Sequence, residues 1–419
     1  MLSPAGPPLS NSRPAPDVVA SLRCPHIRNP DSVSPTPSYD IDAWRNKIPL
    51  LRTTIPMNNC SHAPLLDGVR EAAERYTASW NQDGMDWDAW VGEVEAARRS
   101  FAGLINADPG DVAVCASVSQ AVASIAGALD YGGSRHTVVA SMAEFPSVGH
   151  VWLAHQKLGA QLRWVAVADG EVPLDGYRSA VDDDTLIVSA CHGYYQTGFK
   201  QDLDAIVDIS HSKGALLFVD AYQTMGTHPI DVTALDVDFL ASGNLKYLMG
   251  APGIAFLYVK REVADRLEPT LTGWFGRKNP FAFTVDALAW ADGARRFDMG
   301  TPPIASAYVA RAGMDAIAEV GPAAIRDWTQ VLSGRLIEGG RERGLELLGP
   351  DDPKRKTPNN AFLSPGDSHR AEVLMRGRGV LAAARGPALR LAPHFYSTLD
   401  DVDAALDALA EVFSVLASE

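Results

Sequence analysis

Short apolar runs recur between residues 112 and 259, and they alternate with segments of helical periodicity. These runs are rich in β-branched residues and lack the strict alternation of a half-exposed strand, which is typical of strands buried on both faces. The runs are DVAVCAS, TVVASM, LRWVAVA, TLIVSACH, ALLFVDA, VDFLASG and GIAFLYV. Buried strands that alternate with helices predict an α/β fold with a mainly parallel sheet and helices on both of its faces.

Helical segments flank this region on both sides. Before it, PLLDGVREAAERYTASW and DAWVGEVEAARRSFAGLI repeat apolar residues every three or four positions, which predicts amphipathic helices. After Gly300, longer helical patterns and two short extended pieces, NNAFLS and ALRLAP, predict a smaller α+β domain. The first forty residues are rich in Pro and Ser, and we expect an extended arm there without catalytic residues. The expected division is an N-terminal extension at 1–45, a large domain at 46–300 and a small C-terminal domain at 301–419.

The composition favours small-molecule chemistry. The 419 residues carry a formal net charge of -14, which argues against a nucleic-acid or anionic membrane partner. No apolar stretch approaches the ~20 residues that cross a bilayer. The four cysteines form neither a CxxC pair nor a zinc-site spacing, so we expect no metal and a reducing, cytoplasmic location. They are Cys24, Cys60, Cys115 and Cys191.

An acid and a lysine follow neighbouring strands of the predicted sheet. Asp220 ends one apolar run, and Lys246 follows the next run within a loop of small residues. The carboxyl ends of parallel strands form one edge of a sheet, where ligands bind. Pyridoxal-phosphate enzymes need this pair, because the lysine forms a Schiff base and the carboxylate keeps the pyridine nitrogen protonated.

The segment VDAYQTMGTHPIDVTALDVDFLASGNLKYLMGAPGIAFLYV resembles the lysine region of the class V aminotransferases. This family of pyridoxal-phosphate enzymes of fold type I includes kynureninases, cysteine desulfurases and isopenicillin N epimerase-like proteins. The resemblance implies pyridoxal 5'-phosphate as the cofactor and fold type I for the large domain. It also implies four roles: Asp220 on the pyridine nitrogen, Gln223 near the phenolic oxygen, Ser242 near the phosphate and Lys246 as the Schiff-base lysine.

Further segments extend the resemblance over most of residues 50 to 410. ASVSQAVASIAGAL resembles the first phosphate-binding turn, which implies that Ser119 and Gln120 contact the phosphate. EFPSVGHVW resembles the FPS segment of kynureninases, which implies that Phe145 stacks on the pyridine ring. GWFGRKNPFAF implies a phosphate contact from Trp274. The GTPP turn implies that Thr301 reaches the phosphate of a neighbouring subunit, and such a shared site implies a homodimer.

The remaining segments concern the substrate. ACHGYYQTGFKQDL resembles the strand and loop beneath the cofactor, and it leaves the contact residue open among Tyr194, Tyr195 and Gln196. ALRLAPHFYS resembles the carboxyl-terminal segment of the family, which implies that Arg390 binds a substrate carboxylate through two parallel hydrogen bonds. Arg385 is a second candidate for that role.

Two departures from the family pattern bear on the reaction. Leu245 precedes the lysine, where relatives commonly have His or Tyr, so the proton relay of true kynureninases lacks a donor. Cysteine desulfurases carry a nucleophilic cysteine shortly before the carboxylate-binding arginine, but the stretch from Arg376 to Arg390 contains none. The usual route of persulfide transfer is therefore excluded.

The fold alone does not decide the reaction. We rank first a β-elimination from a cysteine S-conjugate that releases a thiol, pyruvate and ammonia. The alternatives are kynureninase-like hydrolysis, amino-acid epimerisation and decarboxylation-coupled deamination. A binding module without activity would require loss of the lysine or of its acid partner, and both Lys246 and Asp220 are present.

Overall fold

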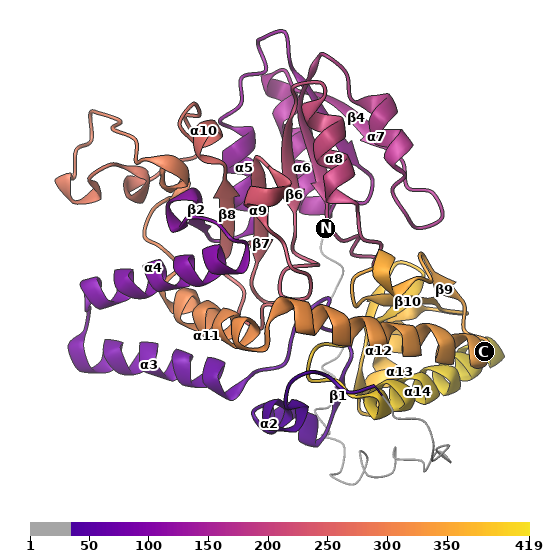
Figure 1. Ribbon diagram of the computed structural model, residues 1–419. Helices are drawn as coiled ribbons and strands as arrows, with labels where there is room; N and C mark the ends of the chain where they lie inside the picture. The colour runs from indigo at the N-terminus through magenta and orange to yellow at the C-terminus, as the bar shows by residue number, and fades with distance from the viewer. Residues whose placement is uncertain (1–34) are drawn as a thin grey trace.

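The computed structural model describes residues 35–419 (Figure 1). Most of the predicted N-terminal arm, together with Cys24, lies outside the described residues. No helix within residues 35–419 is long and apolar enough to cross a membrane.

A seven-stranded sheet forms the centre of the chain, with the strand order β2-β8-β7-β6-β5-β3-β4. Strands β3 to β7 run parallel to one another, and β8 is antiparallel to both of its neighbours. Each of the seven apolar runs in the sequence forms one of these strands, so the predicted α/β fold with a mainly parallel sheet is confirmed. The strands are β2 (Val112–Cys115), β3 (Thr137–Ser141), β4 (Gln161–Val165), β5 (Thr185–Cys191), β6 (Leu216–Asp220), β7 (Phe239–Gly243) and β8 (Ala255–Val259).

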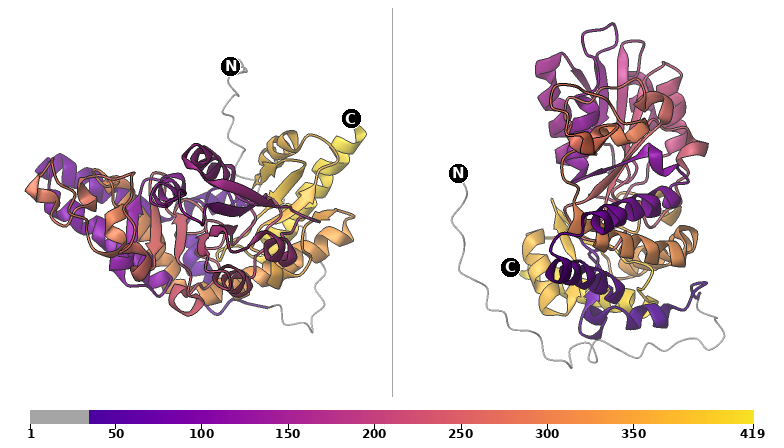
Figure 2. Two further views of the ribbon diagram at one scale, coloured as in Figure 1. Left: turned by 90° about the horizontal axis from the view of Figure 1, so that it is seen from above. Right: turned by 90° about the vertical axis from the view of Figure 1, so that its left-hand side faces the viewer.

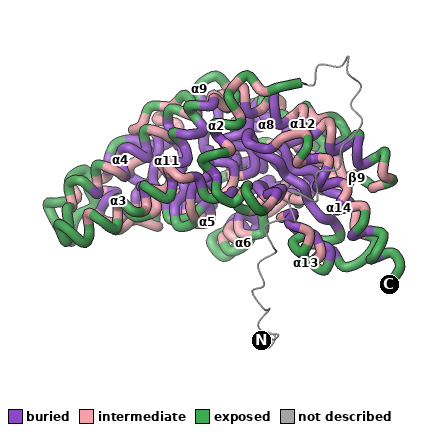
Figure 3. Tube along the Cα trace, turned by 90° about the horizontal axis from the view of Figure 1, so that it is seen from below, coloured by how far each residue is buried: buried purple, intermediate pink, exposed green. Residues whose placement is uncertain are grey.

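Both faces of the sheet are buried by apolar side chains, as the missing polar alternation predicts. Along β6, Leu217 and Val219 join one hydrophobic cluster, whereas Phe218 between them joins the cluster on the opposite face. Figure 3 shows the buried trace along the middle of the molecule and exposed residues around it. The helices of the sheet region are α3 (Asp67–Asp83), α4 (Trp87–Leu104), α5 (Val118–Ala126), α6 (Pro146–His155), α7 (Leu174–Ala180), α8 (Leu203–His211), α9 (Val232–Leu235), α10 (Arg261–Ala264) and α11 (Ile304–Val320).

The C-terminal part has its own antiparallel sheet, in the order β12-β13-β10-β9, and its own hydrophobic cluster. In Figures 1 and 2 this part (orange to yellow) lies to one side of the central sheet. Its elements are β9 (Leu347–Leu348), β10 (Asn360–Leu363), β11 (Val380–Leu381), β12 (Ala383–Arg385), β13 (Ala388–Leu391), α12 (Pro322–Glu342), α13 (Ser368–Gly377) and α14 (Leu399–Ser418).

The N-terminal segment packs on the C-terminal part. Strand β1 (Ile55–Pro56) pairs in parallel with β11, and Arg45 of α2 (Ile41–Asn46) forms an ion pair of 2.5 Å with Asp401. Helix α11 instead packs against α3 and α4 beside the large sheet (Figure 1). Helix α11 therefore packs with the large part, whereas α12 belongs to the C-terminal part. The predicted domain boundary at residue 300 stays a prediction.

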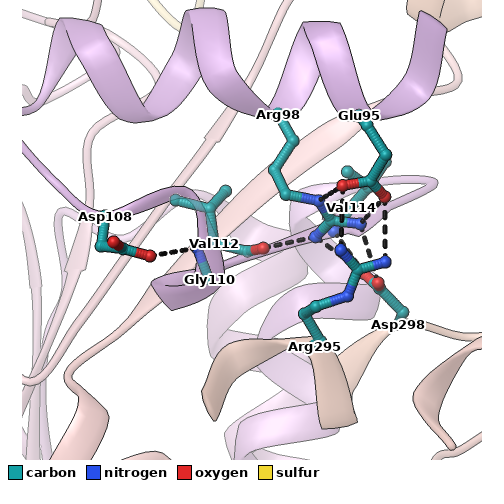
Figure 4. Close-up of polar contacts among 8 residues, drawn as sticks. All are labelled: Glu95, Arg98, Asp108, Gly110, Val112, Val114, Arg295 and Asp298. Carbon is teal, nitrogen blue, oxygen red and sulfur yellow. Dashed lines mark hydrogen bonds and ion pairs between the residues drawn. The ribbon is translucent and has the colours of Figure 1, made fainter. Parts of the chain in front are cut away.

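A buried ionic network ties α4 to the edge of the central sheet (Figure 4). Arg98 of α4 is fully enclosed and binds Asp298 at 2.8 Å and Glu95 at 3.2 Å. Asp298 also accepts a hydrogen bond of 2.8 Å from the backbone N–H of Val114 in the edge strand β2. Arg295 approaches Glu95 from the solvent side at 2.9 Å. The carboxylate of Asp298 thus pairs with the buried guanidinium of Arg98 and also accepts a hydrogen bond from the edge strand β2.

Replacing Asp298 by Asn should lower the stability of the fold by about 3 kcal/mol, because removal of one partner leaves a buried guanidinium underpaired. The control is Arg295→Gln, which breaks a partly exposed pair and should cost less than about 1 kcal/mol. Urea denaturation followed by tryptophan fluorescence measures both. Equal midpoints for the two variants would contradict the structural role given to Asp298.

Candidate active site

The carboxyl ends of β5, β6 and β7 form the floor of a cavity of about 380 Å³. Cys191 pairs in register with Asp220, and Asp220 pairs with Ala241, so the three strands end side by side. Lys246 follows β7 in a turn. The β12–β13 hairpin of the C-terminal part adds Arg385 and Arg390 to the wall. Such a cavity is large enough for a small cofactor and its substrate.

Lys246 lies among aromatic rings at this edge. Its Nζ is 4.2 Å from the centroid of the Tyr222 ring and 5.6 Å from that of Phe145. Gly243 makes room for Tyr222, because a Cβ at that position would lie 2.2 Å from the tyrosine Cζ. Burial lowers the pKa of Lys246 to about 8, although Asp220 acts in the opposite direction. The neutral amine is therefore much more abundant near physiological pH than for an exposed lysine, whose pKa is about 10.4.

Asp220 is a buried carboxylate with few partners. Its Oδ1 accepts a hydrogen bond of 2.9 Å from the backbone N–H of Tyr222. Burial raises the pKa of Asp220, and the positive charge of Lys246 lowers it. A protonated nitrogen placed beside this carboxylate would favour its charged form. The position therefore suits an acid that must hold a cationic ring nitrogen.

A second acid, Glu144, lies buried behind the cavity. Burial raises its pKa well above the ordinary value, and the charge of Asp220 raises it further. Its Oε1 accepts a hydrogen bond of 3.3 Å from Ser189 Oγ. The proximity of two buried carboxyl groups favours the neutral form of Glu144 while Asp220 carries the charge beside Lys246.

Arg390 is 1% exposed and contacts three neutral acceptors. Its Nε donates to Ala383 O at 3.2 Å, Nη1 to Tyr195 O at 2.7 Å and Nη2 to Ser61 Oγ at 2.9 Å. No carboxylate within residues 35–419 forms an ion pair with it. A guanidinium has five N–H donors, so two remain free beside the cavity for an anionic ligand.

The N-terminus of α5 provides an anion-binding end. Ser117 caps the helix and accepts a hydrogen bond of 3.1 Å from the backbone N–H of Gln120, and Ser119 lines the cavity. The Gln120 side chain turns back, and its Oε1 accepts a hydrogen bond of 2.6 Å from Ala116 N. Ser119 is thus available to a phosphate, whereas the Gln120 carbonyl oxygen is engaged with the backbone.

Six predicted site residues come together around the cavity. They are Ser119, Phe145, Asp220, Gln223, Lys246 and Arg390. The amide nitrogen of Gln223 donates to Cys60 O at 3.1 Å, which leaves its second N–H for a ligand. Of the three alternatives in the YYQ segment, Tyr195 lines the cavity.

Other predicted residues lie outside the cavity wall. Ser242 is buried, and its hydroxyl donates to Gly243 O at 2.9 Å. Trp274 stacks on Trp87 with ring centroids 5.9 Å apart. Thr301 is exposed, and its predicted contact is with a neighbouring subunit, which a single chain does not test. The roles of these three residues and of Gln120 stay predictions.

Sequence reasoning missed several cavity residues. Tyr222 lies between Asp220 and Gln223 without a role implied by the resemblance, and Glu144, which is buried behind the cavity, precedes the FPS segment without a motif of its own. Cys60 and Ser61 also line the cavity, but nothing in the sequence indicates that Ser61 binds Arg390. These contacts depend on residues far apart along the chain.

The donor set fits pyridoxal 5'-phosphate. The cavity offers an amine for the aldehyde, a buried carboxylate for the ring nitrogen, and a hydroxyl at a helix N-terminus for the phosphate. Among the described residues, no group of three or more His, Cys, Asp or Glu side chains could hold a metal ion.

Comparisons with known proteins agree with this assignment. The family model "Aminotransferase class-V" matches residues 64–390. The uncharacterized aminotransferase YcbU of Bacillus subtilis is 37% identical over 369 residues, covering 88% of this chain and 97% of that protein. A kynureninase of Pseudomonas fluorescens is 27% identical over 347 residues, covering 80% and 81%. Among solved structures, a C-DES mutant with glycine covalently linked to its PLP cofactor has a TM-score of 0.80 at 18% identity, covering 88% and 99%.

The lowered pKa of Lys246 predicts how its amine reacts in cofactor-free protein. Labelling with limiting acetic anhydride should rise with pH through a midpoint near pH 8, the pKa of the amine, and should be nearly level at higher pH, because only the neutral amine is nucleophilic. An exposed lysine, with an ordinary pKa of about 10.4, should still gain label at pH 10. Mass spectrometry of the Lys246 peptide measures the profile. A profile that still rises at pH 10 would show that burial does not perturb this amine.

Proposed function

Because the chain belongs to the aminotransferase class-V family of pyridoxal-phosphate enzymes, we propose that it is a carbon–sulfur β-lyase acting on cysteine S-conjugates. The family shows that the chain is a pyridoxal-phosphate enzyme that acts on amino acids. The choice of reaction and of substrate class rests on the groups around the cavity.

One observation carries the choice of reaction. Among the described residues that line the cavity, Lys246 is the one amine, since the other cationic side chains are the guanidinium groups of Arg385 and Arg390. Burial raises the pKa of Tyr222 to about 12 and raises that of the Cys191 thiol. A site with a single amine suits elimination, in which one lysine removes a proton from Cα. Epimerisation needs a second proton carrier on the opposite face of Cα.

Each residue has a separate role in the proposed reaction. Arg390 binds the α-carboxylate, and the neutral amine of Lys246 accepts the Cα proton. When bound, pyridoxal phosphate supplies an electron sink for the charge left on Cα, and Asp220 supports it by keeping the ring nitrogen protonated. The Cβ–S bond then breaks and the sulfur leaves with the electron pair as a thiolate. With one water consumed, the products are a thiol, pyruvate and ammonium.

Leu245 and the cysteines bear on the alternatives. Leu245 lines the cavity beside the lysine and offers neither a donor nor an acceptor from its side chain, which disfavours a hydrolytic relay. The hairpin that carries Arg390 contains no cysteine, although the thiols of Cys60 and Cys191 line the cavity. We assign neither thiol to sulfur transfer.

A homodimer is part of the same proposal. The segment after Trp274 presents large apolar side chains to solvent, with Phe281 51% and Phe283 71% exposed. Contiguous exposed apolar side chains are typical of interaction sites. Thr301 is exposed as well, so both features are available to a second copy of the chain.

Purified enzyme should release ethanethiol, pyruvate and ammonia in equal amounts from S-ethyl-L-cysteine. Kynurenine and L-alanine serve as comparison substrates, with anthranilate and D-alanine as the products to detect. The double variant Cys60→Ser/Cys191→Ser should keep most of the activity, because no thiol takes part. Anthranilate release, racemisation of alanine without pyruvate, or loss of activity in the double variant would each overturn the lyase assignment.

A further inference from the structure

Arg385 and Arg390 lie on one face of the β12–β13 hairpin. Arg390 pairs across the hairpin with Ala383, and Arg385 pairs with Ala388. Residues that pair in an antiparallel ladder share a face, as do residues two apart in one strand. Both arginines therefore point to the same side, and both line the cavity above Lys246.

Arg385 differs from the other arginines of this region because no carboxylate within residues 35–419 pairs with it. Its neighbours along the chain are all paired: Arg370 with Glu419 at 2.5 Å, Arg376 with Glu372 at 3.6 Å and Arg378 with Glu411 at 3.2 Å. Arg385 is exposed to the cavity mouth without an acid. The hairpin thus keeps a free guanidinium beside the one that Arg390 provides.

The charge of the cavity is opposite to that of the chain. The formal net charge of the whole sequence is -14. In contrast, Lys246, Arg385 and Arg390 line the cavity with Asp220 as the single carboxylate among the described lining residues. Asp220 lies on the floor and is suited to the ring nitrogen, so it does not neutralise the arginines at the mouth. A concave site of one sign concentrates ligands of the other.

We propose that Arg385 binds a second anionic group, so that the substrates are amino acids with a carboxylate on the side chain. Resting on the lyase assignment above, this inference makes S-conjugates whose leaving thiol carries a carboxylate the preferred substrates, ahead of uncharged conjugates such as S-ethyl-L-cysteine. Arg390 holds the α-carboxylate within the cavity. Arg385 lies two residues after Ala383, the residue that pairs with Arg390. Its guanidinium holds the distal carboxylate at the mouth of the cavity.

The test compares two ligands that differ in one charge. S-carboxymethyl-L-cysteine carries the distal carboxylate, and S-carbamoylmethyl-L-cysteine replaces it by an amide of nearly the same shape. The holoenzyme should favour the carboxylate by about tenfold in kcat/KM, the scale of one charged hydrogen bond. Arg385→Gln should remove that preference, and Arg385→Lys should retain part of it. Arg376→Gln, which removes a charge outside the cavity, should leave the preference intact.

A binding measurement separates this inference from the lyase assignment. The desamino analogues 3-(carboxymethylthio)propionate and 3-(carbamoylmethylthio)propionate cannot react with the cofactor, and calorimetry gives their Kd values for the holoenzyme. If the dicarboxylate binds more tightly and Arg385→Gln removes the difference, the inference holds even when no S-conjugate is cleaved. Equal affinity for both analogues in the unmodified enzyme would overturn it. Loss of the cofactor absorbance in Arg385→Gln would also overturn it, because Arg385 would then bind the cofactor phosphate.

Discussion

Arg390 joins three distant parts of the chain at one buried point. Its guanidinium contacts the β12 backbone, the carbonyl oxygen of Tyr195 and the hydroxyl of Ser61. All three acceptors are neutral, whereas the other fully buried guanidinium described above, that of Arg98, has the carboxylates of Asp298 and Glu95. Because an unpaired buried charge is costly, a fold that keeps Arg390 in this state favours an anionic ligand. We infer that the substrate α-carboxylate is that ligand.

The hydrogen bonds of Arg390 also join the C-terminal part to the loops at the edge of the large sheet. Asp220 ends β6 and Lys246 follows β7, so the large sheet and its loops could hold a cofactor without the C-terminal part. It could not distinguish an amino acid from a simple amine, because the arginines come from the β12–β13 hairpin. We infer that docking of that hairpin on Tyr195 and Ser61 adds the group that binds the substrate carboxylate to the cofactor site.

The sequence allowed prediction of the sheet and of the central pair, because both are encoded locally. Each buried strand is a short apolar run, and the order of strand, acid, strand and lysine brings Asp220 and Lys246 to one edge. The contact of Arg390 with Ser61 joins residues more than 300 positions apart, and no local pattern reports it. The same limit explains why the packing of β1 on β11 was not expected.

The binding of Arg390→Lys to an amino acid and to its decarboxylated amine tests the account most directly. The substitution keeps the charge but loses the planar fork. The Kd of S-ethyl-L-cysteine, read from the change in cofactor absorbance, should rise about 10- to 100-fold, whereas that of S-ethylcysteamine should stay within about twofold. An equal rise for both ligands would mean that Arg390 supports the structure or the cofactor, and it would contradict the role given to its buried guanidinium.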